Sequence, residues 1–426
     1  MDPQIKKHFS GQDNKQHKIL VISSKFPNKI QFQQGLFVYE LVRELSKENQ
    51  FVVICPISKT PSISLMKRAF KKPAVLRQHY QQIKKIPRID NYHGISVYYP
   101  KLWYLPKKIA HFSDGILLFS RLMPSILRIR KTFKFEIIHA QFAFPEGFVA
   151  TMLGKIFGVP SVVHCQGSDI NADLGKNVVL TRFVTYTLNQ AHYVFAASKE
   201  IQQKINSYTK LDGLLKLVPN GVNLRLFFPY DKIKARKILN LPLEKSIIFY
   251  VGGLYWSKGV NYLIDAMEVV AQQCPDVFLY ILGEGDLNDA LQRKVQKLDM
   301  EDRVIFLGNM PHTKVPRWMN AVDLLILPSV SEGWPPVIPE SLACGTPVIA
   351  SRVGGIPEII DSSKIGLLSN PRDASDLAKN ILFGLSKTWN ESLLVNKAMQ
   401  YSWRKIATEV NDVYFSLSTN NKVDAP

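Results

Sequence analysis

The sequence predicts an α/β protein built from two doubly wound domains that face each other across a cleft. Short apolar strands alternate with helix-like segments, which is typical of parallel sheets covered on both faces. The chain has 426 residues, enough for two cores, and a turn-rich stretch at Leu217–Pro229 separates two such series. We therefore expect a disordered tail over residues 1–17 and domains over 18–222 and 223–401, with a last helix at about 402–417 returning to the first domain.

Five β-rich runs in the first half end in small or polar residues, as buried parallel strands do. In order they read KILVISS, QFVVICP, EIIHAQF, PSVVHCQG and HYVFAAS. Helix-like segments separate some of them, namely LFVYELVRELSKEN after Gly35 and GFVATMLGKIFG from Gly147. This order predicts the first parallel sheet.

A second series of β-branched runs follows residue 229. Its members are SIIFYVGG, VFLYILGEG, RVIFLGN, DLLILPS and TPVIAS. The last segment, SWRKIATEVNDVYFSL, is amphipathic, and Ser402 is a suitable N-cap for it.

The amino-acid composition excludes several classes of protein for this chain. The chain is 46% hydrophobic and 21% charged, which is ordinary for a globular protein. Its four cysteines form no CxxC pair, which argues against a disulfide framework or a zinc site and suits a reducing cytoplasm. No apolar run reaches the roughly 18–20 residues that span a bilayer. No DxD metal-binding motif occurs, so we expect no metal.

The positive charge is concentrated in the first half of the chain. Residues 1–210 hold 31 Lys and Arg against 12 Asp and Glu, which accounts for the whole formal charge of +19. Most of it lies in a basic region, residues 58–134, with 17 basic and two acidic residues, together with many aromatic residues. Such a region favours an anionic membrane surface or a polyanion, although an ordinary solvated surface is the alternative.

Polar residues at strand ends mark a candidate site in the second domain, because ligands of parallel sheets bind beyond the carboxyl ends of the strands. Gly253 and Lys258 follow one strand and suit a phosphate, although a plain strand–helix turn would look the same. Gly283 and Gly285 follow the next. Glu332 and Glu340 flank a stiff proline-rich turn, and Glu340 falls in the first turn of a helix. A glycosidase carboxylate pair is the rival interpretation, but nothing else in the chain supports it.

Two strand ends of the first domain offer a candidate acceptor pocket. The segments IIHAQFAFPEG and VVHCQGSDIN carry the polar residues His139, Gln141, His164, Gln166 and Asp169. Each of them could equally be an ordinary core or turn residue.

Together these motifs resemble family 4 of the retaining glycosyltransferases, which have the GT-B architecture of two Rossmann-like domains. The most specific motif is E-x7-E, EGWPPVIPESLACGTPVIAS, from Glu332. Supporting pieces are VPNGVN, VGGLYWSKG, ILGEGD, VIFLGNM and SWRKIATEVNDVY. The segments KFPNKIQFQQGLFVYELVREL and HAQFAFPEGFVATMLGK are similar to members that build bacterial surface polysaccharides. The resemblance covers about residues 18–417.

The resemblance implies roles for single residues. Lys258 would hold the donor pyrophosphate, Glu340 the ribose hydroxyls and Glu332 the transferred sugar. The remaining donor-binding residues would be Gly253, Gly283, Gly285, Gly308, Met310, Gly333 and Trp334. Gly35, Gln141, His164, Gln166 and Asp169 would bind the acceptor. The candidate catalytic residues are Glu332, Lys258 and His139.

This chain departs from the family pattern in three places. Gly253 stands where relatives often carry a phosphate-binding arginine. Gln141 and Gln166 replace histidines, and glutamine is no proton acceptor at neutral pH, which leaves His139 or His164 as the candidate.

The function implied is transfer of a sugar from a UDP- or GDP-sugar, with retention and without a metal or cofactor, to a glycolipid or polysaccharide at the cytoplasmic face of the inner membrane. The alternative is a sugar-nucleotide epimerase of the same architecture. A nucleic-acid-binding protein would fit only the basic half, because no known nucleic-acid signature occurs.

Overall fold

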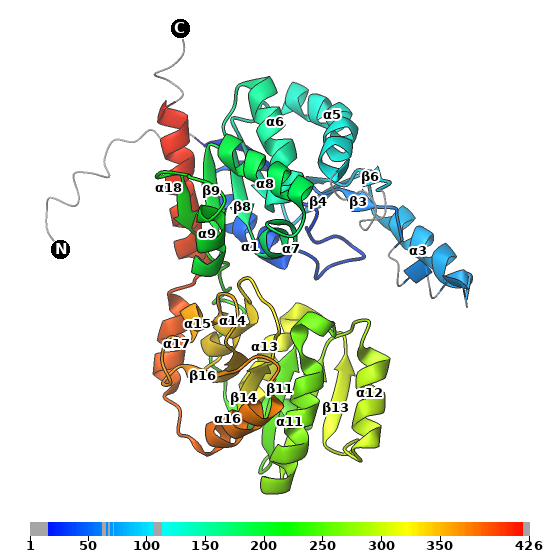
Figure 1. The fold of residues 1–426 in the computed structure, drawn as a ribbon, viewed down its shortest axis with the longest axis vertical. Helices are drawn as coiled ribbons and strands as arrows, with labels where there is room; N and C mark the ends of the chain where they lie inside the picture. The colour runs from blue at the N-terminus through cyan, green and yellow to red at the C-terminus, as the bar shows by residue number, and fades with distance from the viewer. Residues whose placement is uncertain (1–15, 62–64, 67–68, 71, 105–112, 421–426) are drawn as a thin grey trace, which may run out of the picture.

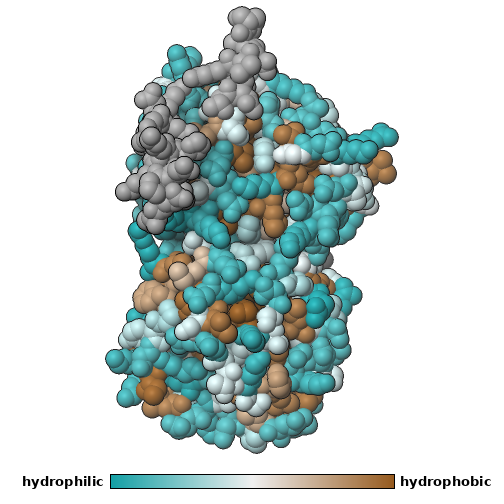
Figure 2. Space-filling model, turned by 90° about the vertical axis from the view of Figure 1, so that its left-hand side faces the viewer, coloured by the Kyte–Doolittle hydropathy of each residue, from teal (hydrophilic) through white to brown (hydrophobic). Residues whose placement is uncertain are grey.

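The computed structural model describes residues 16–61, 65–66, 69–70, 72–104 and 113–420. The predicted tail, residues 1–17, lies outside this range up to residue 15, and His17 is buried at 3% exposure. Two domains lie one above the other, with a waist between them (Figures 1 and 2). The predicted α/β fold class is confirmed.

The first domain contains an eight-stranded sheet in the order β10-β9-β8-β7-β1-β2-β5-β4. Its neighbours pair in parallel except β4 with β5. The strands are β1 (Lys18–Ile22), β2 (Gln50–Ile54), β4 (Ile89–Tyr92), β5 (Ile95–Tyr98), β7 (Ile137–Gln141), β8 (Ser161–Cys165), β9 (Tyr193–Ala196) and β10 (Leu215–Leu217). A separate pair joins β3 (Ile57–Ser58) to β6 (Lys101–Leu102).

The second domain contains a six-stranded, wholly parallel sheet in the order β13-β12-β11-β14-β15-β16. The strands are β11 (Ser246–Val251), β12 (Val277–Leu282), β13 (Val304–Gly308), β14 (Leu324–Leu327), β15 (Val348–Ser351) and β16 (Gly366–Ser369). The order changes direction at β11, so β11 and β14 flank the crevice where ligands of doubly wound sheets bind.

Helices cover both faces of the sheets. In the first domain they are α1 (Leu36–Leu45), α3 (Ala74–Lys85), α5 (Asp114–Thr132), the π-turn Ala143–Gly147, α6 (Phe148–Phe157), α7 (Ser168–Asp173), α8 (Val178–Gln190) and α9 (Lys199–Asn206). In the second they are α10 (Lys232–Ile238), α11 (Val260–Gln273), α12 (Asn288–Lys297), α13 (Val315–Ala321), α14 (Val337–Ala343), α15 (Ile356–Ile359), α16 (Ala374–Ser386) and α17 (Glu391–Met399).

Strand β1 illustrates why buried strands of this sheet are apolar throughout. Ile19 and Val21 join the core cluster formed with α1, whereas Leu20 and Ile22 join the cluster formed with α5 and α6. Because successive side chains point to opposite faces, a strand buried on both sides needs apolar residues at every position.

The last helix, α18 (Trp403–Asn420), returns to the first domain, as predicted. Ile406, Val410 and Tyr414 pack into the same cluster as α1. The amide nitrogen of Asn49 donates to the side-chain oxygen of Asn411 at 2.8 Å. Ser402 accepts from the backbone N–H of Lys405 at 3.4 Å, which is the predicted cap.

Two segments cross side by side between the domains. The N–H of Val222 donates to the carbonyl of Tyr401 at 2.7 Å, and the N–H of Trp403 donates back to Val222 at 3.3 Å. These two bonds make a parallel bridge between Val222 and Ser402. The outgoing and returning chain segments therefore behave as one connection.

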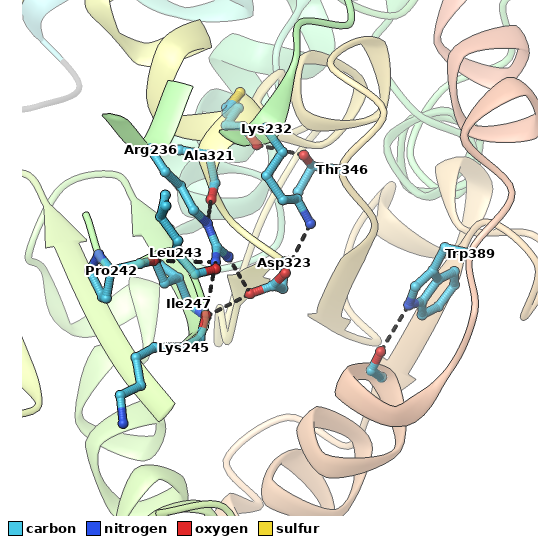
Figure 3. Close-up of polar contacts among 12 residues, drawn as sticks. Lys232, Arg236, Pro242, Leu243, Lys245, Ile247, Ala321, Asp323, Thr346 and Trp389 are labelled. Atoms are coloured by element: carbon cyan, nitrogen blue, oxygen red, sulfur yellow. Dashed lines mark hydrogen bonds and ion pairs between the residues drawn. The ribbon is translucent and has the colours of Figure 1, made fainter. Parts of the chain in front are cut away.

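A buried arginine ties α10 to the second sheet (Figure 3). Arg236 is 4% exposed. Its guanidinium donates to the carbonyls of Ala321 at 2.8 Å and Leu243 at 2.6 Å, and to Asp323 at 2.8 Å. Lys232 approaches the other oxygen of Asp323 from the exposed side at 2.9 Å.

We expect Arg236→Met to destabilise the second domain by about 3 kcal/mol, because buried carbonyls and a carboxylate lose their donor. Lys232→Met is the matched control and should cost at most about 1 kcal/mol, since its side chain is 48% exposed. Urea unfolding of both variants measures the difference, and equal midpoints would contradict the anchoring role of Arg236.

Candidate functional site

A cleft of about 550 Å³ lies between the two domains. Four predicted site residues line it: Gly35 from the first domain and Gly253, Lys258 and Glu340 from the second. The other lining residues are Lys25, Gln33, Gln34, Leu36, Phe37, Glu40, Gly221, Asn223, His312, Pro336 and Trp403. Because both domains contribute walls, the cleft exists only when they are together.

Lys258 and Glu332 form an ion pair beside the cleft. Lys258 ends the short 3₁₀ turn Trp256–Lys258 that follows β11, and its Nζ lies 2.6 Å from Oε1 of Glu332. The hydroxyl of Ser329 donates to the same oxygen at 2.7 Å. The Glu332 side chain is 8% exposed and that of Lys258 is 28% exposed. The residues predicted for phosphate and for sugar therefore lie in contact.

The glycines after β12 allow neighbouring turns to pack. A Cβ on Gly283 would lie 1.9 Å from the carbonyl oxygen of Gly252, and a Cβ on Gly285 would lie 2.3 Å from that of Leu254. Both contacts are with backbone, which leaves no room for a side chain. These glycines hold the Gly253 turn in place, whereas ligand contact by Gly283 and Gly285 stays a prediction.

Glu340 lies in the first turn of α14, as predicted from the prolines before it. His312, in the 3₁₀ turn His312–Lys314, contacts it: Nε2 lies 3.0 Å from Oε1. Burial alone would lower the pKa of His312, but the carboxylates of Glu340 and Glu40 outweigh burial and raise it. A cationic imidazole beside Glu340 is therefore favoured.

The predicted base-binding loop Gly308–Met310 meets the first domain. Gly308 ends β13 with φ +68°, and the side-chain amide of Gln33 donates to the carbonyl of Met310. Gln33 also lines the cleft. The segment 308–310 thus lies where the two domains touch.

The loop carrying Gly333 and Trp334 is also held by the first domain. A Cβ on Gly333 would lie 2.3 Å from the carbonyl oxygen of Gln166. Trp334 is 5% exposed, and its indole N–H donates to the carbonyl of Asn220 at 3.0 Å. The backbone of this loop therefore packs directly on the first-domain loop that contains Gln166.

We expect Gly333→Ala to push these two loops apart, because the new methyl group would meet the backbone of Gln166 and Gly167. The cost should be about 2 kcal/mol, or roughly a 5 °C drop in Tm. Ser331→Ala, an exposed position in the same loop, is the control and should leave Tm unchanged. Thermal unfolding that treats both variants alike would disprove the close contact.

The loop that carries Gly35 packs against the segment of residues 24–27, which is itself held by hydrogen bonds. Gly35 has φ +70°, and a Cβ there would lie 2.3 Å from the carbonyl oxygen of Lys25. The carboxylate of Glu146 accepts the N–H of Ser24 at 3.0 Å, and the hydroxyl of Tyr99 donates to the carbonyl of Pro27 at 2.5 Å. Gly35 is the predicted acceptor-side residue that lines the cleft.

The other predicted first-domain residues lie beneath the cleft surface. His139, Gln141 and His164 are each 1% exposed, Asp169 is 6% exposed and Gln166 is 9% exposed. None of these five residues lines the cleft described above. Their predicted contact with an acceptor stays a prediction.

These buried side chains form a chain of hydrogen bonds instead. His139 Nδ1 lies 2.5 Å from the hydroxyl of Tyr414 and Nε2 lies 3.3 Å from the amide of Gln141. Gln166 then donates to Gln141 at 2.9 Å, and Asn220 donates to Gln166 at 2.8 Å. The chain connects α18 with the segment that holds Trp334.

Burial keeps both histidines neutral. It lowers the pKa of His139 well below its usual value, with a further contribution from His164, and lowers that of His164 to about 4. Asp169 accepts the N–H of Ala143 at 2.6 Å and that of Gly167 at 2.9 Å, so it shapes the loop that packs on Gly333. This geometry favours supporting roles for these residues.

The sequence did not mark three residues with ionisable side chains that line the cleft: Lys25, Glu40 and His312. Glu40 lies on α1, five residues after Gly35, and accepts from Asn223 at 3.3 Å while pairing with Arg43. His312 lies two residues after Met310. No local pattern distinguishes these residues from ordinary surface residues, so only the fold identifies them.

A second cavity, of about 600 Å³, lies at the amino ends of β14 and β15. Figure 3 shows four of its lining residues, Lys232, Asp323, Thr346 and Trp389. Two of its polar side chains bond to backbone carbonyls: Thr346 Oγ1 donates to that of Met319 at 2.5 Å, and Trp389 Nε1 to that of Gly384 at 2.9 Å. None of the predicted site residues lines it.

Among the helices of the described residues, none is long and apolar enough to cross a membrane. In the same part of the chain, no three His, Cys, Asp or Glu side chains are grouped as a metal site would require.

Two protein-family models match this chain, and together they cover most of both domains. Residues 34–226 match the model described as Glycosyltransferase Family 4, and residues 231–399 match that described as Glycosyl transferases group 1. The glycosyltransferase TuaC of Bacillus subtilis, named for teichuronic acid biosynthesis, is 30% identical over 370 residues. The match covers 85% of this chain and 88% of TuaC.

Solved structures share the fold. The sucrose-phosphate synthase from Thermosynechococcus elongatus superposes with a TM-score of 0.76 at 22% identity, over 95% of this chain and 100% of that one. HepE from Anabaena, solved in complex with UDP-glucose, superposes with a TM-score of 0.68 at 22% identity, over 94% of this chain and 100% of HepE.

Proposed function

The chain belongs to glycosyltransferase family 4 and is a glycosyltransferase of GT-B fold, and from this premise we propose that it transfers a sugar, with retention, from a nucleoside-diphosphate sugar to a lipid-linked or polysaccharide acceptor. The observation that carries the proposal is the cleft where Gly253, Lys258 and Glu340 lie together, facing Gly35. We place the reaction at the cytoplasmic face of the inner membrane.

A UDP- or GDP-sugar suits the second-domain wall of the cleft. HepE, which shares the fold, was solved with UDP-glucose. In this chain Lys258 would contact the diphosphate, Glu332 the sugar and Glu340 the ribose. The backbone amides of Gly333 and Trp334 would lie near the sugar and phosphates, and Gly308–Met310 would border the base.

Lys258 stabilises the leaving group in this proposal. As the bond between the anomeric carbon and the phosphate oxygen breaks, negative charge grows on the diphosphate, and the ammonium group offsets it. The contact with Glu332 places Lys258 and the carboxylate that would orient the sugar within 2.6 Å of each other. Lys25 and His312 line the same cleft and add positive charge where Gly253 provides none.

Attack from the same face explains retention without a protein nucleophile. The acceptor oxygen bonds to the anomeric carbon on the side that the diphosphate leaves, and the departing phosphate oxygen takes the acceptor proton. The scheme uses no metal or cofactor. His139 takes no part in this scheme as a base. Its buried imidazole bonds to Tyr414, and His139 is not among the residues that line the cleft.

Two observations support the proposed acceptor: the name of the relative TuaC and the positive charge of the first domain. TuaC is named for teichuronic acid biosynthesis. Helix α3 projects from the first domain (Figure 1) and carries exposed Lys84 and Lys85. Phe70 is 92% exposed and Trp103 is 51% exposed, with Lys59 over the Trp103 ring at 5.9 Å. Exposed basic and aromatic residues suit an anionic membrane surface.

The membrane-facing part of the basic region 58–134 is smaller than the sequence suggested. Tyr99 is fully buried, and Tyr98, Tyr104 and Phe119 pack against the core. Part of the predicted surface, at residues 62–64, 67–68, 71 and 105–112, lies outside the described residues, and with it Lys107, Lys108 and Phe112. Phe70, α3 and Trp103 remain as the proposed attachment surface.

Neither alternative gains support. TuaC is named a glycosyltransferase and both family models describe glycosyltransferases, so no observation favours a sugar-nucleotide epimerase. The family assignment accounts for both domains without a nucleic-acid partner.

The first test is donor binding. We expect one member of a panel of UDP-, GDP-, ADP- and dTDP-sugars to raise Tm and to give ligand-observed NMR signals with the wild-type protein. Binding with no transfer to any extracted glycolipid, combined with conversion of the bound sugar, would favour an epimerase. Binding of no member would refute the proposed donor class.

We expect Lys258→Ala and Glu332→Gln each to lower transfer by at least about tenfold, because each removes a charged contact to the reacting groups. Lys297→Ala and Glu301→Gln change exposed residues of the same domain and serve as controls. Initial rates at saturating acceptor measure the effect. Wild-type rates in both site variants would rule out these roles.

We expect Lys84→Ala/Lys85→Ala to weaken binding to vesicles containing phosphatidylglycerol roughly thirtyfold, since each lysine near an anionic surface contributes about 1 kcal/mol. Lys237→Ala/Lys297→Ala removes the same charge from the second domain and is the control. Flotation at low salt compares them. Equal flotation of the wild type on phosphatidylcholine alone would contradict electrostatic attachment.

A further inference from the structure

A histidine that the sequence did not mark contacts the carboxylate predicted to bind ribose. His312 and Glu340 come from turns after β13 and β14, and both line the cleft. Nε2 of His312 lies 3.0 Å from Oε1 of Glu340. The side chains are 28% and 14% exposed, so the contact is partly shielded from water. Phe227, fully buried, packs against the imidazole at a ring distance of 5.1 Å and restricts its rotation.

A second carboxylate reaches this histidine from the other domain. Glu40, on α1, raises the pKa of His312 together with Glu340, against the opposing effect of burial. Glu40 pairs with Arg43 and accepts from Asn223, and burial raises its own pKa. The charged groups around the imidazole are therefore Glu340 from its own domain and the Glu40–Arg43 pair from the first.

We propose that His312 is a positioning residue for the nucleotide: its bond to Oε1 fixes the Glu340 carboxylate so that Oε2 faces the ribose hydroxyls. This inference rests on the proposed function, because it assumes that Glu340 accepts bonds from a donor nucleotide. A carboxylate has about four acceptor positions, so the bond from His312 leaves room for a ribose diol. Without His312, Glu340 is free to rotate away from the cleft.

The pairing predicts a pH dependence of donor affinity. Folding raises the pKa of His312 above its ordinary value of about 6.5. Below the folded pKa the imidazole is cationic and its bond to Glu340 is charge-assisted. As pH rises through that pKa the charge is lost, the bond weakens and donor affinity falls. The diphosphate of a sugar nucleotide carries no proton that titrates near neutral pH, so the ligand does not contribute.

Calorimetric titration across pH tests the inference. The probe is the tightest binder among UDP-, GDP-, ADP- and dTDP-glucose. We expect His312→Leu to weaken its binding about tenfold, and His312→Gln, which still offers an N–H, about threefold. Wild-type affinity should fall several-fold between about pH 6 and pH 8.5, whereas both variants should show no such slope. His93→Gln, an exposed histidine of the first domain, should behave as the wild type.

A second readout follows the pair itself without a ligand. Histidine NMR titration should give a His312 pKa above its ordinary value in the wild type and a lower one in Glu340→Gln, because the main attractive charge is removed. In turnover assays the His312 variants should raise the donor KM more than they lower kcat, which a merely misfolded site would not do.

The outcomes separate the two proposals. If the wild type binds none of the four sugar nucleotides, the proposed function and this inference both fail. If the wild type binds one and His312→Leu binds it equally well at every pH, the donor-site proposal stands and the positioning role of His312 is overturned. An unchanged His312 pKa in Glu340→Gln would also overturn it.

Discussion

The parallel bridge between Val222 and Ser402 is the constraint on which the cleft depends. Among the described residues, two segments cross between the domains, and this bridge joins them. The bridge therefore restrains how the two domains lie relative to each other. A Cβ on Gly221 would lie 2.6 Å from the Trp403 ring, so the close pairing requires glycine there. Both Gly221 and Trp403 line the cleft. The connection is thus also part of the binding surface.

Each carboxylate of the E-x7-E segment has a cation beside it. Glu332 pairs with Lys258, which follows β11, and Glu340 pairs with His312, which follows β13. Each carboxylate thus has a hydrogen-bond donor in contact with it, although the Glu332 side chain is only 8% exposed and that of Glu340 only 14% exposed. Strand β11 is the neighbour of β14, after which the segment begins, whereas β13 lies at the edge of the sheet. His312 therefore contacts Glu340 from the turn that precedes α13, and not through neighbouring strands.

The sequence predicted the backbone of the site better than its side chains. β-Branched runs located the strands on both sides of the cleft, and the prolines before Val337 located the start of α14. The strands β3, β4, β5, β6, β10 and β16 were missed, because they are short. The position of a residue near a strand end did not predict whether its side chain lines the cleft. His139 lies near the end of β7, yet its imidazole bonds to Tyr414 of α18, which follows 275 residues later in the sequence. His312 and Glu340 meet only through tertiary packing.

The return of α18 to the first domain has a consequence for biosynthesis. Domains form as units while the chain leaves the ribosome. The second domain is continuous from α10 to α17, so all of its segments emerge together. The first domain lacks the partners of Leu41 and Val42 until Ile406, Val410 and Tyr414 have been made. The first domain therefore keeps this apolar face open until α18 has been synthesised, after the whole of the second domain.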